Sequence, residues 1–149
     1  MHLCNSKLAE LTTNIADDIK EKEESYKKLE RDIIDDLGND SIDKEEARNE
    51  ASLRLLDIAQ SALLSSKKLG KSIENEEDFT QDELKIINLV REWYEKTKDY
   101  YKCKSDFYFY MVGEEKEKSN HIKKELTEIK REISQLVDSI NRNDGLKKN

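Results

Sequence analysis

The 149-residue sequence contains no proline, only four glycines and only two histidines. Proline breaks helix interiors, because it lacks an amide N–H and its ring collides with the preceding turn. Its absence leaves long helices uninterrupted. The shortage of histidine excludes a di-iron helical bundle, which needs Glu-x-x-His pairs on facing helices. Neither His2 nor His121 has a glutamate three residues before it.

Cysteine is also scarce, since Cys4 and Cys103 are the only two and no C-x-x-C motif occurs. This excludes a small domain held together by many disulfides and a zinc site built on paired cysteines. In an antiparallel helical bundle the two residues would lie roughly 30 Å apart, at a rise of about 1.5 Å per residue. We therefore expect two reduced thiols.

Long apolar runs and an excess of positive charge are missing as well. No apolar run approaches the ~18 residues of a membrane span, and the first residues lack the apolar core of a signal peptide. We expect a soluble cytoplasmic protein with no membrane span. The net charge of -7 and the pI of about 5.1 disfavour nucleic-acid binding, which usually requires a basic face.

The composition that remains is typical of long solvated helices. Charged residues make up 41% of the chain and hydrophobic residues 35%, whereas globular chains average about 25% and 45 to 50%. Glycine is favoured just after helices, and each of the four glycines follows a segment with helical periodicity. The sequence therefore predicts one all-α domain, an elongated antiparallel four-helix bundle with coiled-coil-like seams. The expected helices span about 4–37, 43–69, 80–112 and 115–143.

The segment 84–112 holds most of the large apolar surface. It contains eight of the ten aromatic residues, namely Trp93, Tyr94, Tyr100, Tyr101, Phe107, Tyr108, Phe109 and Tyr110. Most of its apolar residues fall on two neighbouring lines that cover an arc of roughly 160°, wider than the ~100° stripe of a surface helix. Such a helix contacts two neighbours. Thr80 and Glu83 form a capping box, and Phe79 and Leu84 occupy the positions of a hydrophobic staple.

The two flanking helices show complementary patterns. The helix at 43–69 begins with a second capping box, Asp43 and Glu46, and its alanines predict packing against the bulky aromatic helix. In the last helix, Ile122, Leu126, Ile129, Ile133, Leu136 and Ile140 form a heptad seam. We favour packing of this seam inside its own bundle. The alternative is a parallel coiled-coil homodimer through the same residues, so a homo-oligomer stays open.

Catalytic and metal-binding patterns are weak throughout. Glu21 and Glu24 form an E-x-x-E pair, but no E-x-x-D follows on the second helix to complete a magnesium site. Cys103 and His121 could meet as nucleophile and base, although an inert thiol is the better interpretation. Asp35, Asp36 and Asp40 could bind a cation, although chance acidity explains them better. We expect no enzyme activity, no cofactor and no resident metal.

The function indicated is that of a non-catalytic protein-interaction or regulatory module with a protein partner. Phe109 and Tyr110 lie at roughly 160° and 260° from Trp93 around a helix, away from the apolar lines. We predict that they form an exposed partner-binding patch. The alternatives are that the helix distorts near Gly113 or that a neighbouring helix end covers them. A further alternative function is a small-molecule sensor whose tyrosine-rich helix lines a pocket.

Overall fold

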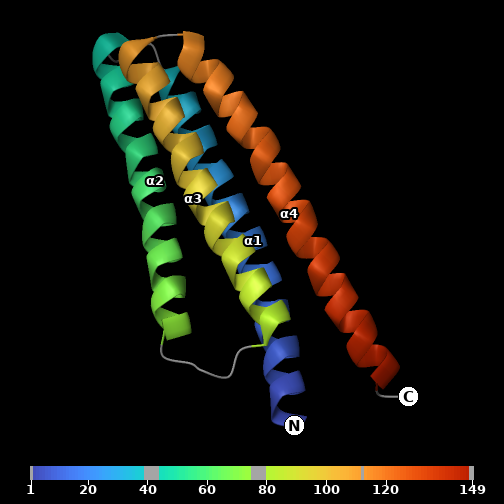
Figure 1. Cartoon of the computed structure of the whole chain (residues 1–149). Coiled ribbons are helices and arrows are strands. Elements are labelled where there is room, and N and C mark those ends of the chain that lie inside the picture. The colour runs from blue at the N-terminus through green and yellow to red at the C-terminus, as the bar shows by residue number, and fades with distance from the viewer. Residues whose placement is uncertain (1, 39–43, 75–79, 112, 148–149) are drawn as a thin grey trace.

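The computed structural model describes residues 2–38, 44–74, 80–111 and 113–147, and their side chains over 17–38, 44–71, 80–111 and 113–139. Four α-helices account for nearly all of these residues, and no strand occurs among them. They are α1 (His2–Leu37), α2 (Lys44–Glu74), α3 (Gln81–Tyr110) and α4 (Gly113–Lys147). Successive helices run in opposite directions (Figure 1). The prediction of an all-α antiparallel four-helix bundle is confirmed.

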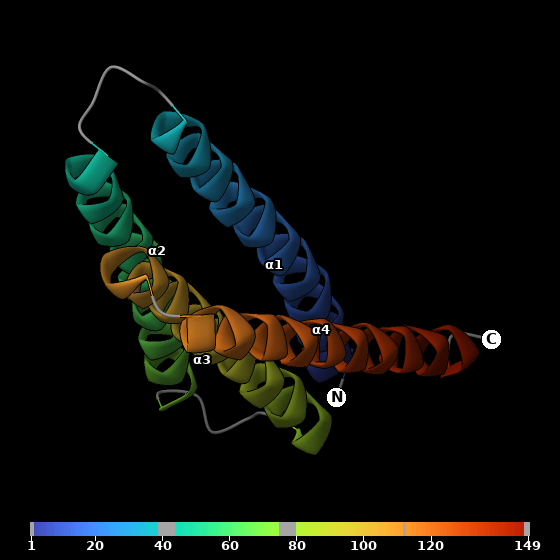
Figure 2. The ribbon, with the colours of Figure 1, turned by 90° about the horizontal axis from the view of Figure 1, so that it is seen from above.

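The helices are packed unevenly. The contact between α2 and α3 is the most extensive, followed by that between α3 and α4, whereas α1 contacts the other three helices sparsely. Seen from above, α1 and α4 run in different directions, and the C-terminal end of α4 stands apart from the other helices (Figure 2). The bundle is therefore open along the side where α1 faces α3 and α4.

The buried side chains in the described part of α1, from residue 17 onward, form a single row. Ile19, Tyr26 and Ile33 follow each other at seven-residue intervals and are all buried. A spacing of seven residues is close to two helical turns, so these side chains lie nearly in line along the helix. In contrast, α3 buries residues on two sides, including Ile86, Ile87 and Trp93. The third helix is the centre of the core, as its wide apolar arc predicts.

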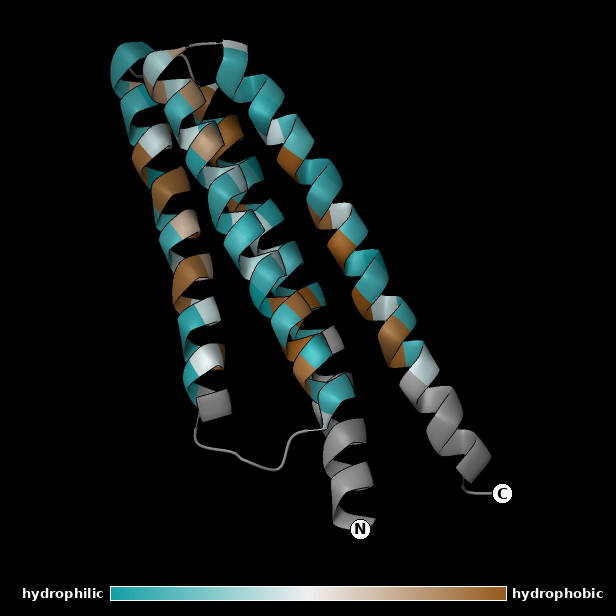
Figure 3. Cartoon of the chain, in the orientation of Figure 1, coloured by the Kyte–Doolittle hydropathy of each residue, from teal (hydrophilic) through white to brown (hydrophobic). Residues whose placement is uncertain are grey.

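The close approach of α2 to α3 depends on small residues. Ala51, Ala59 and Ala62 are at most 3% exposed and lie within the core cluster. Small side chains on one helix make room for the bulky side chains of its neighbour. The predicted packing of α2 against the aromatic helix is confirmed. Hydrophobic patches alternate with hydrophilic surface along α2, α3 and α4 (Figure 3).

The start of α3 agrees with the sequence prediction. Thr80 is the N-cap, and its hydroxyl accepts a hydrogen bond from the Glu83 amide at 3.3 Å. The Glu83 carboxylate accepts a hydrogen bond from the same hydroxyl at 3.2 Å. Among the other predicted start signals, Phe79 and Asp43 lie outside the described residues.

The prediction that every glycine marks a helix end is wrong at two positions. Gly145 lies inside α4, and Gly70 lies inside α2, which continues to Glu74. A Cβ atom at residue 70 would come within 3.1 Å of the Arg91 guanidinium, so this glycine lets Arg91 of α3 pass close to α2. Its role is packing between helices. The left-handed position after α3 is taken by Met111, with φ of 57°.

The apolar seam of α4 is packed within the chain. Ile129 and Ile133 are buried in the core cluster, Ile122, Leu126 and Leu136 pack against it, and the side chain of Ile140 lies outside the described part. An ion pair of 2.5 Å between Lys96 of α3 and Glu125 of α4 accompanies this contact. The predicted intrachain packing of the described seam is confirmed. None of the described helices is long and apolar enough to cross a membrane.

Candidate functional site

Three consecutive large side chains at the end of α3 are exposed to solvent. Phe109 is 57% exposed, Tyr110 is 65% exposed and Met111 is 50% exposed. The rings of Phe109 and Tyr110 contact each other edge to face, with centroids 4.8 Å apart. We call these three residues the tip patch. The tip patch is a small apolar surface of the kind that large aromatics form at the centres of protein interfaces.

The helix geometry explains why these side chains point outward. Tyr108 packs against the core, so the next two residues, turned by about 100° each, point away from it. The helix is regular through Tyr110, and the Met111 amide donates a hydrogen bond to the Phe107 carbonyl at 2.7 Å. The exposed fractions show that no described neighbouring helix end covers Phe109 or Tyr110. The predicted exposure of both residues is therefore correct, whereas the alternative of a covering helix is wrong.

Sequence reasoning missed Met111 as the third member of the tip patch. It assigned the end of the helix to Gly113, and periodicity placed Met111 on the apolar line of Trp93. The left-handed backbone at Met111 takes its side chain off that line. A non-glycine residue at positive φ is uncommon, and no sequence signal at Met111 predicts it.

The possible Cys103 and His121 pair does not form a catalytic dyad. Burial raises the pKa of the half-buried Cys103 thiol, and the nearby Glu115 carboxylate raises it further. A raised pKa leaves the sulfur protonated and unreactive. His121 is largely exposed and lies 3.0 Å from Glu125. The Cys4 side chain lies outside the described part, so the expected distance between the two cysteines stays a prediction.

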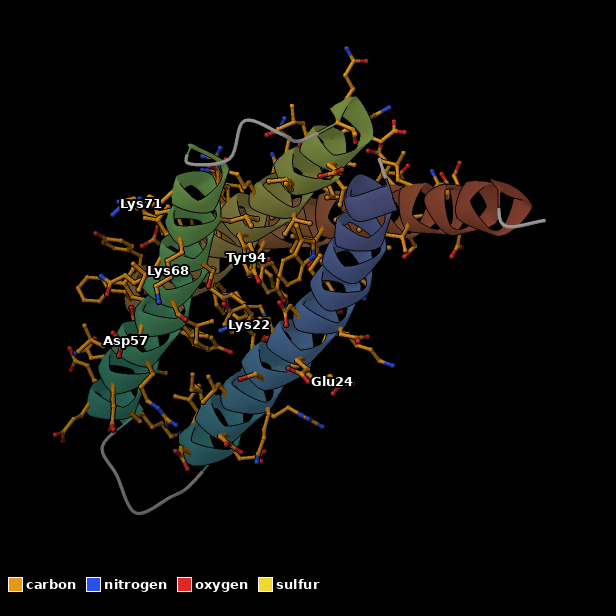
Figure 4. All side chains as sticks on the ribbon, turned by 90° about the horizontal axis from the view of Figure 1, so that it is seen from below. Lys22, Glu24, Asp57, Lys68, Lys71 and Tyr94 are labelled. Atoms are coloured by element: carbon orange, nitrogen blue, oxygen red, sulfur yellow. The ribbon has the colours of Figure 1, made fainter. Side chains whose placement is uncertain are left out.

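The acidic candidates are not gathered into a metal site. Asp36 pairs with Arg54 at 2.6 Å, Asp35 is exposed, and Asp40 lies outside the described residues. On α1, Glu24 points away from α2 (Figure 4), and it belongs to no described metal-binding group. Among the side chains that the structure describes, no three His, Cys, Asp or Glu residues are grouped closely enough to hold an ion.

The stretch of α3 from Lys96 to Lys104 combines lysines with Tyr100 and Tyr101, and much of it is engaged inside the protein. Tyr100 and Tyr101 are at most 8% exposed, so their faces are not available for stacking on nucleic-acid bases. Lys98 pairs with Asp99 at 3.0 Å, and Lys104 pairs with Glu30 of α1. The tyrosines are part of the packed interior.

Comparison of the chain with protein-family models, with curated proteins and with solved structures finds no match.

Proposed function

We propose that this chain is a non-catalytic protein-interaction module and that its partner binds the tip patch formed by Phe109, Tyr110 and Met111. The observation that supports the proposal is the exposure of three consecutive large apolar side chains on a regular helix end. Solvating such a surface is unfavourable, and burying it against a partner recovers the hydrophobic free energy. We place the module in the cytoplasm, because its sequence has no disulfide framework.

The tip patch differs from the exposed leucines of α2. Leu53 is 64% exposed and Leu64 is 54% exposed, but they lie eleven residues apart on α2, or about 16 Å along the helix. Single exposed leucines are common on protein surfaces. Adjacent aromatic rings that already contact each other offer a larger and more rigid surface, because few rotatable bonds are immobilised on binding.

Photo-crosslinking tests this proposal directly. Tyr110 is replaced by the photoreactive residue p-benzoylphenylalanine, and the protein is irradiated in the source cell. We expect one defined adduct with a partner protein. The same replacement at Leu53 is the control and should give no such adduct. Equal crosslinking from both positions, or none from position 110, would contradict the proposal.

A double variant tests whether the tip patch provides the binding energy. Phe109→Ala combined with Tyr110→Ser should abolish capture of the crosslinked partner, whereas Leu53→Ala combined with Leu64→Ser should leave it intact. Because both aromatic residues are more than half exposed, the free energy of unfolding should change by no more than about 1 kcal/mol. A loss of several kcal/mol would instead show that these rings are part of the core.

A further inference from the structure

A cleft separates α1 from the pair α3 and α4, on the open side of the bundle. Its volume is about 790 Å³, which lies within the range of roughly 300 to 1,000 Å³ that small-molecule sites occupy. Four aromatic residues, Tyr26, Trp93, Tyr100 and Tyr101, line it together with Ile34 and Leu126. The cleft is therefore large enough for a small molecule and largely apolar at its base.

The charge of the cleft is opposite to that of the whole chain. The chain has 27 basic and 34 acidic residues. In contrast, the basic residues that line the cleft are Lys27, Lys28, Arg31, Lys104, Lys123 and Lys130, and the acidic ones are only Glu23, Glu24 and Glu30. A basic cleft with low-dielectric walls in an acidic protein concentrates anions.

The few carboxylates of the cleft leave part of its positive charge uncompensated. Glu23 accepts from both Lys27 and Lys130, and Glu30 accepts from Lys104. No described residue forms an ion pair with the other three basic side chains of the cleft. These are Lys28, Arg31 and Lys123. The cleft therefore has more cationic groups than its own acids can pair.

One polar group in the wall lacks the partner that its burial requires. Tyr26 is only 4% exposed, and its hydroxyl forms no hydrogen bond with any described residue. The Lys104 ammonium lies 5.0 Å from the centre of the Tyr100 ring and pairs with Glu30. Burial, together with the neighbouring charge of Lys123, nevertheless lowers the pKa of Lys104 to about 8. Buried donors are rarely left unpaired in proteins, which suggests that a ligand completes this wall.

The two lysines indicate where an anion would bind. Lys104 comes from α3 and Lys123 from α4, and both line the cleft. An anion between two such ammonium groups accepts a hydrogen bond from each and removes their repulsion. On the opposite side of Tyr26, a smaller hollow of about 280 Å³ lies between α1 and α2, with Lys22 and Asp57 among its lining residues (Figure 4). That hollow has one tyrosine and is less suited to an aromatic or aliphatic ligand.

We propose that the cleft between α1 and the α3–α4 pair binds a small amphiphilic anion. Its acidic head group lies between Lys104 and Lys123, and its aliphatic or aromatic body packs against Ile34 and Leu126, the partly exposed apolar residues of the lining. The Tyr26 hydroxyl donates a hydrogen bond to the ligand from the opposite wall. This site is separate from the tip patch, so it does not depend on the protein-binding proposal.

Fluorescence of Trp93 provides a direct assay, because it is the only tryptophan and lines the cleft. The full chain is titrated with laurate below its critical micelle concentration, and the binding stoichiometry is measured by calorimetry. Lauryl alcohol and dodecylammonium are the matched neutral and cationic probes, and 2-naphthoate replaces the aliphatic body with an aromatic one. We expect saturable binding of one laurate or 2-naphthoate per chain, with the alcohol bound at least about tenfold more weakly.

Three variants locate the site. Lys104→Gln should weaken binding of the anion by about tenfold, because it removes a charge-assisted hydrogen bond. Tyr26→Phe should weaken binding a few-fold without lowering the melting temperature, because the hydroxyl has no partner in the protein. Lys71→Gln removes the same charge from an exposed position on α2 and should leave the dissociation constant unchanged.

Several outcomes would overturn this proposal. They are equal affinity for laurate and lauryl alcohol, the absence of saturable binding by either anion, and unchanged binding in both Lys104→Gln and Tyr26→Phe. Circular dichroism of each variant confirms that it is folded before its affinity is compared. Because Tyr26→Phe removes only one oxygen atom, it keeps the test valid if Lys104→Gln disturbs the packing of α1.

Discussion

Ser52 of α2 and Ser105 of α3 exchange hydrogen bonds across the helix interface. The Ser52 hydroxyl donates to the Ser105 carbonyl at 2.9 Å, and the Ser105 hydroxyl donates to the Ser52 carbonyl at 2.7 Å. Both side chains are buried. The pair fixes the position of α2 along α3, because a shift of either helix by one residue would separate both donors from their acceptors.

Removal of these hydroxyls should destabilise the protein in a coupled way. Ser52→Ala and Ser105→Ala should each lower the free energy of unfolding by about 1 kcal/mol, as expected for a buried hydrogen bond. The loss of unfolding free energy in the double variant should differ clearly from the sum of the two single losses, because the two residues are in direct contact. Urea denaturation of the four proteins measures this coupling, and strictly additive losses would show that the two bonds act independently.

The substitution Ile133→Asp should unfold the chain. Ile133 is 3% exposed within the seam of α4, so the new carboxylate would be buried without a partner. We expect a loss of about 4 kcal/mol or more and a collapse of helicity in circular dichroism. Ser134→Asp, at the exposed neighbouring position, is the control and should stay folded. A variant at position 133 that remains fully helical and only changes its mass in solution would place this seam between two chains.

Met111→Gly should stabilise the protein by roughly 0.5 to 1 kcal/mol, because glycine adopts the left-handed conformation without the steric penalty that a side chain pays there. The backbone of Met111 has φ of 57° and ψ of 36°. Met111→Ala keeps the Cβ atom and should give no such gain. Thermal unfolding compares the two variants. Equal melting temperatures would show that the change in stability comes from loss of the Met111 side chain and not from relief of its left-handed backbone.

Stability should rise with pH between about 8 and 10 through Lys104. Burial lowers the pKa of this ammonium from 10.5 to about 8 in the folded protein. Between these values the unfolded chain holds a proton that the folded chain has released, so raising the pH favours the folded state. Burial raises the pKa of Tyr94 to about 12, and this tyrosine lowers stability only as the pH rises above the ordinary tyrosine value of 10.0.

Urea midpoints between pH 7.5 and 9.5 isolate the contribution of Lys104. The wild-type midpoint should increase over this range relative to that of Lys104→Gln, which should fall slightly because the raised pKa of Cys103 lowers stability as the pH passes its ordinary value of 9.0. A wild-type midpoint that follows the Lys104→Gln midpoint across this range would mean that Glu30 holds the ammonium protonated in the folded state.

The sequence predicts the helices well because their signals are local. The Thr80 cap, the periodic apolar lines of α3 and the alanines of α2 each act within a few turns, and the structure agrees with all three. Exposure of Phe109 and Tyr110 also follows from helical geometry alone. These features depend on the spacing of residues along one helix, and the sequence shows that spacing without any knowledge of how the helices pack.

Other features depend on contacts between distant residues and could not be predicted. In the sequence, Gly70 looks like a residue that ends a helix. In the structure it lies inside α2, where a Cβ atom would approach the guanidinium of Arg91, twenty-one residues later and on another helix. The cleft depends on the angle at which α1 lies to α3 and α4, and periodicity does not encode that angle. Its basic residues come from three helices, each of which taken alone looks like an ordinary solvated surface.

The single row formed by Ile19, Tyr26 and Ile33 has a consequence for how the molecule opens. Because α1 contacts the other helices sparsely and its described side chains, from residue 17 onward, reach the core mainly along this row, we expect it to form a cooperative unit that is less stable than the α2–α3 pair. In native-state hydrogen exchange, the amides of α1 should therefore exchange together and earlier than those of α2 and α3. Partial detachment of α1 would widen the cleft, because the lining residues of the cleft come from α1, α3 and α4.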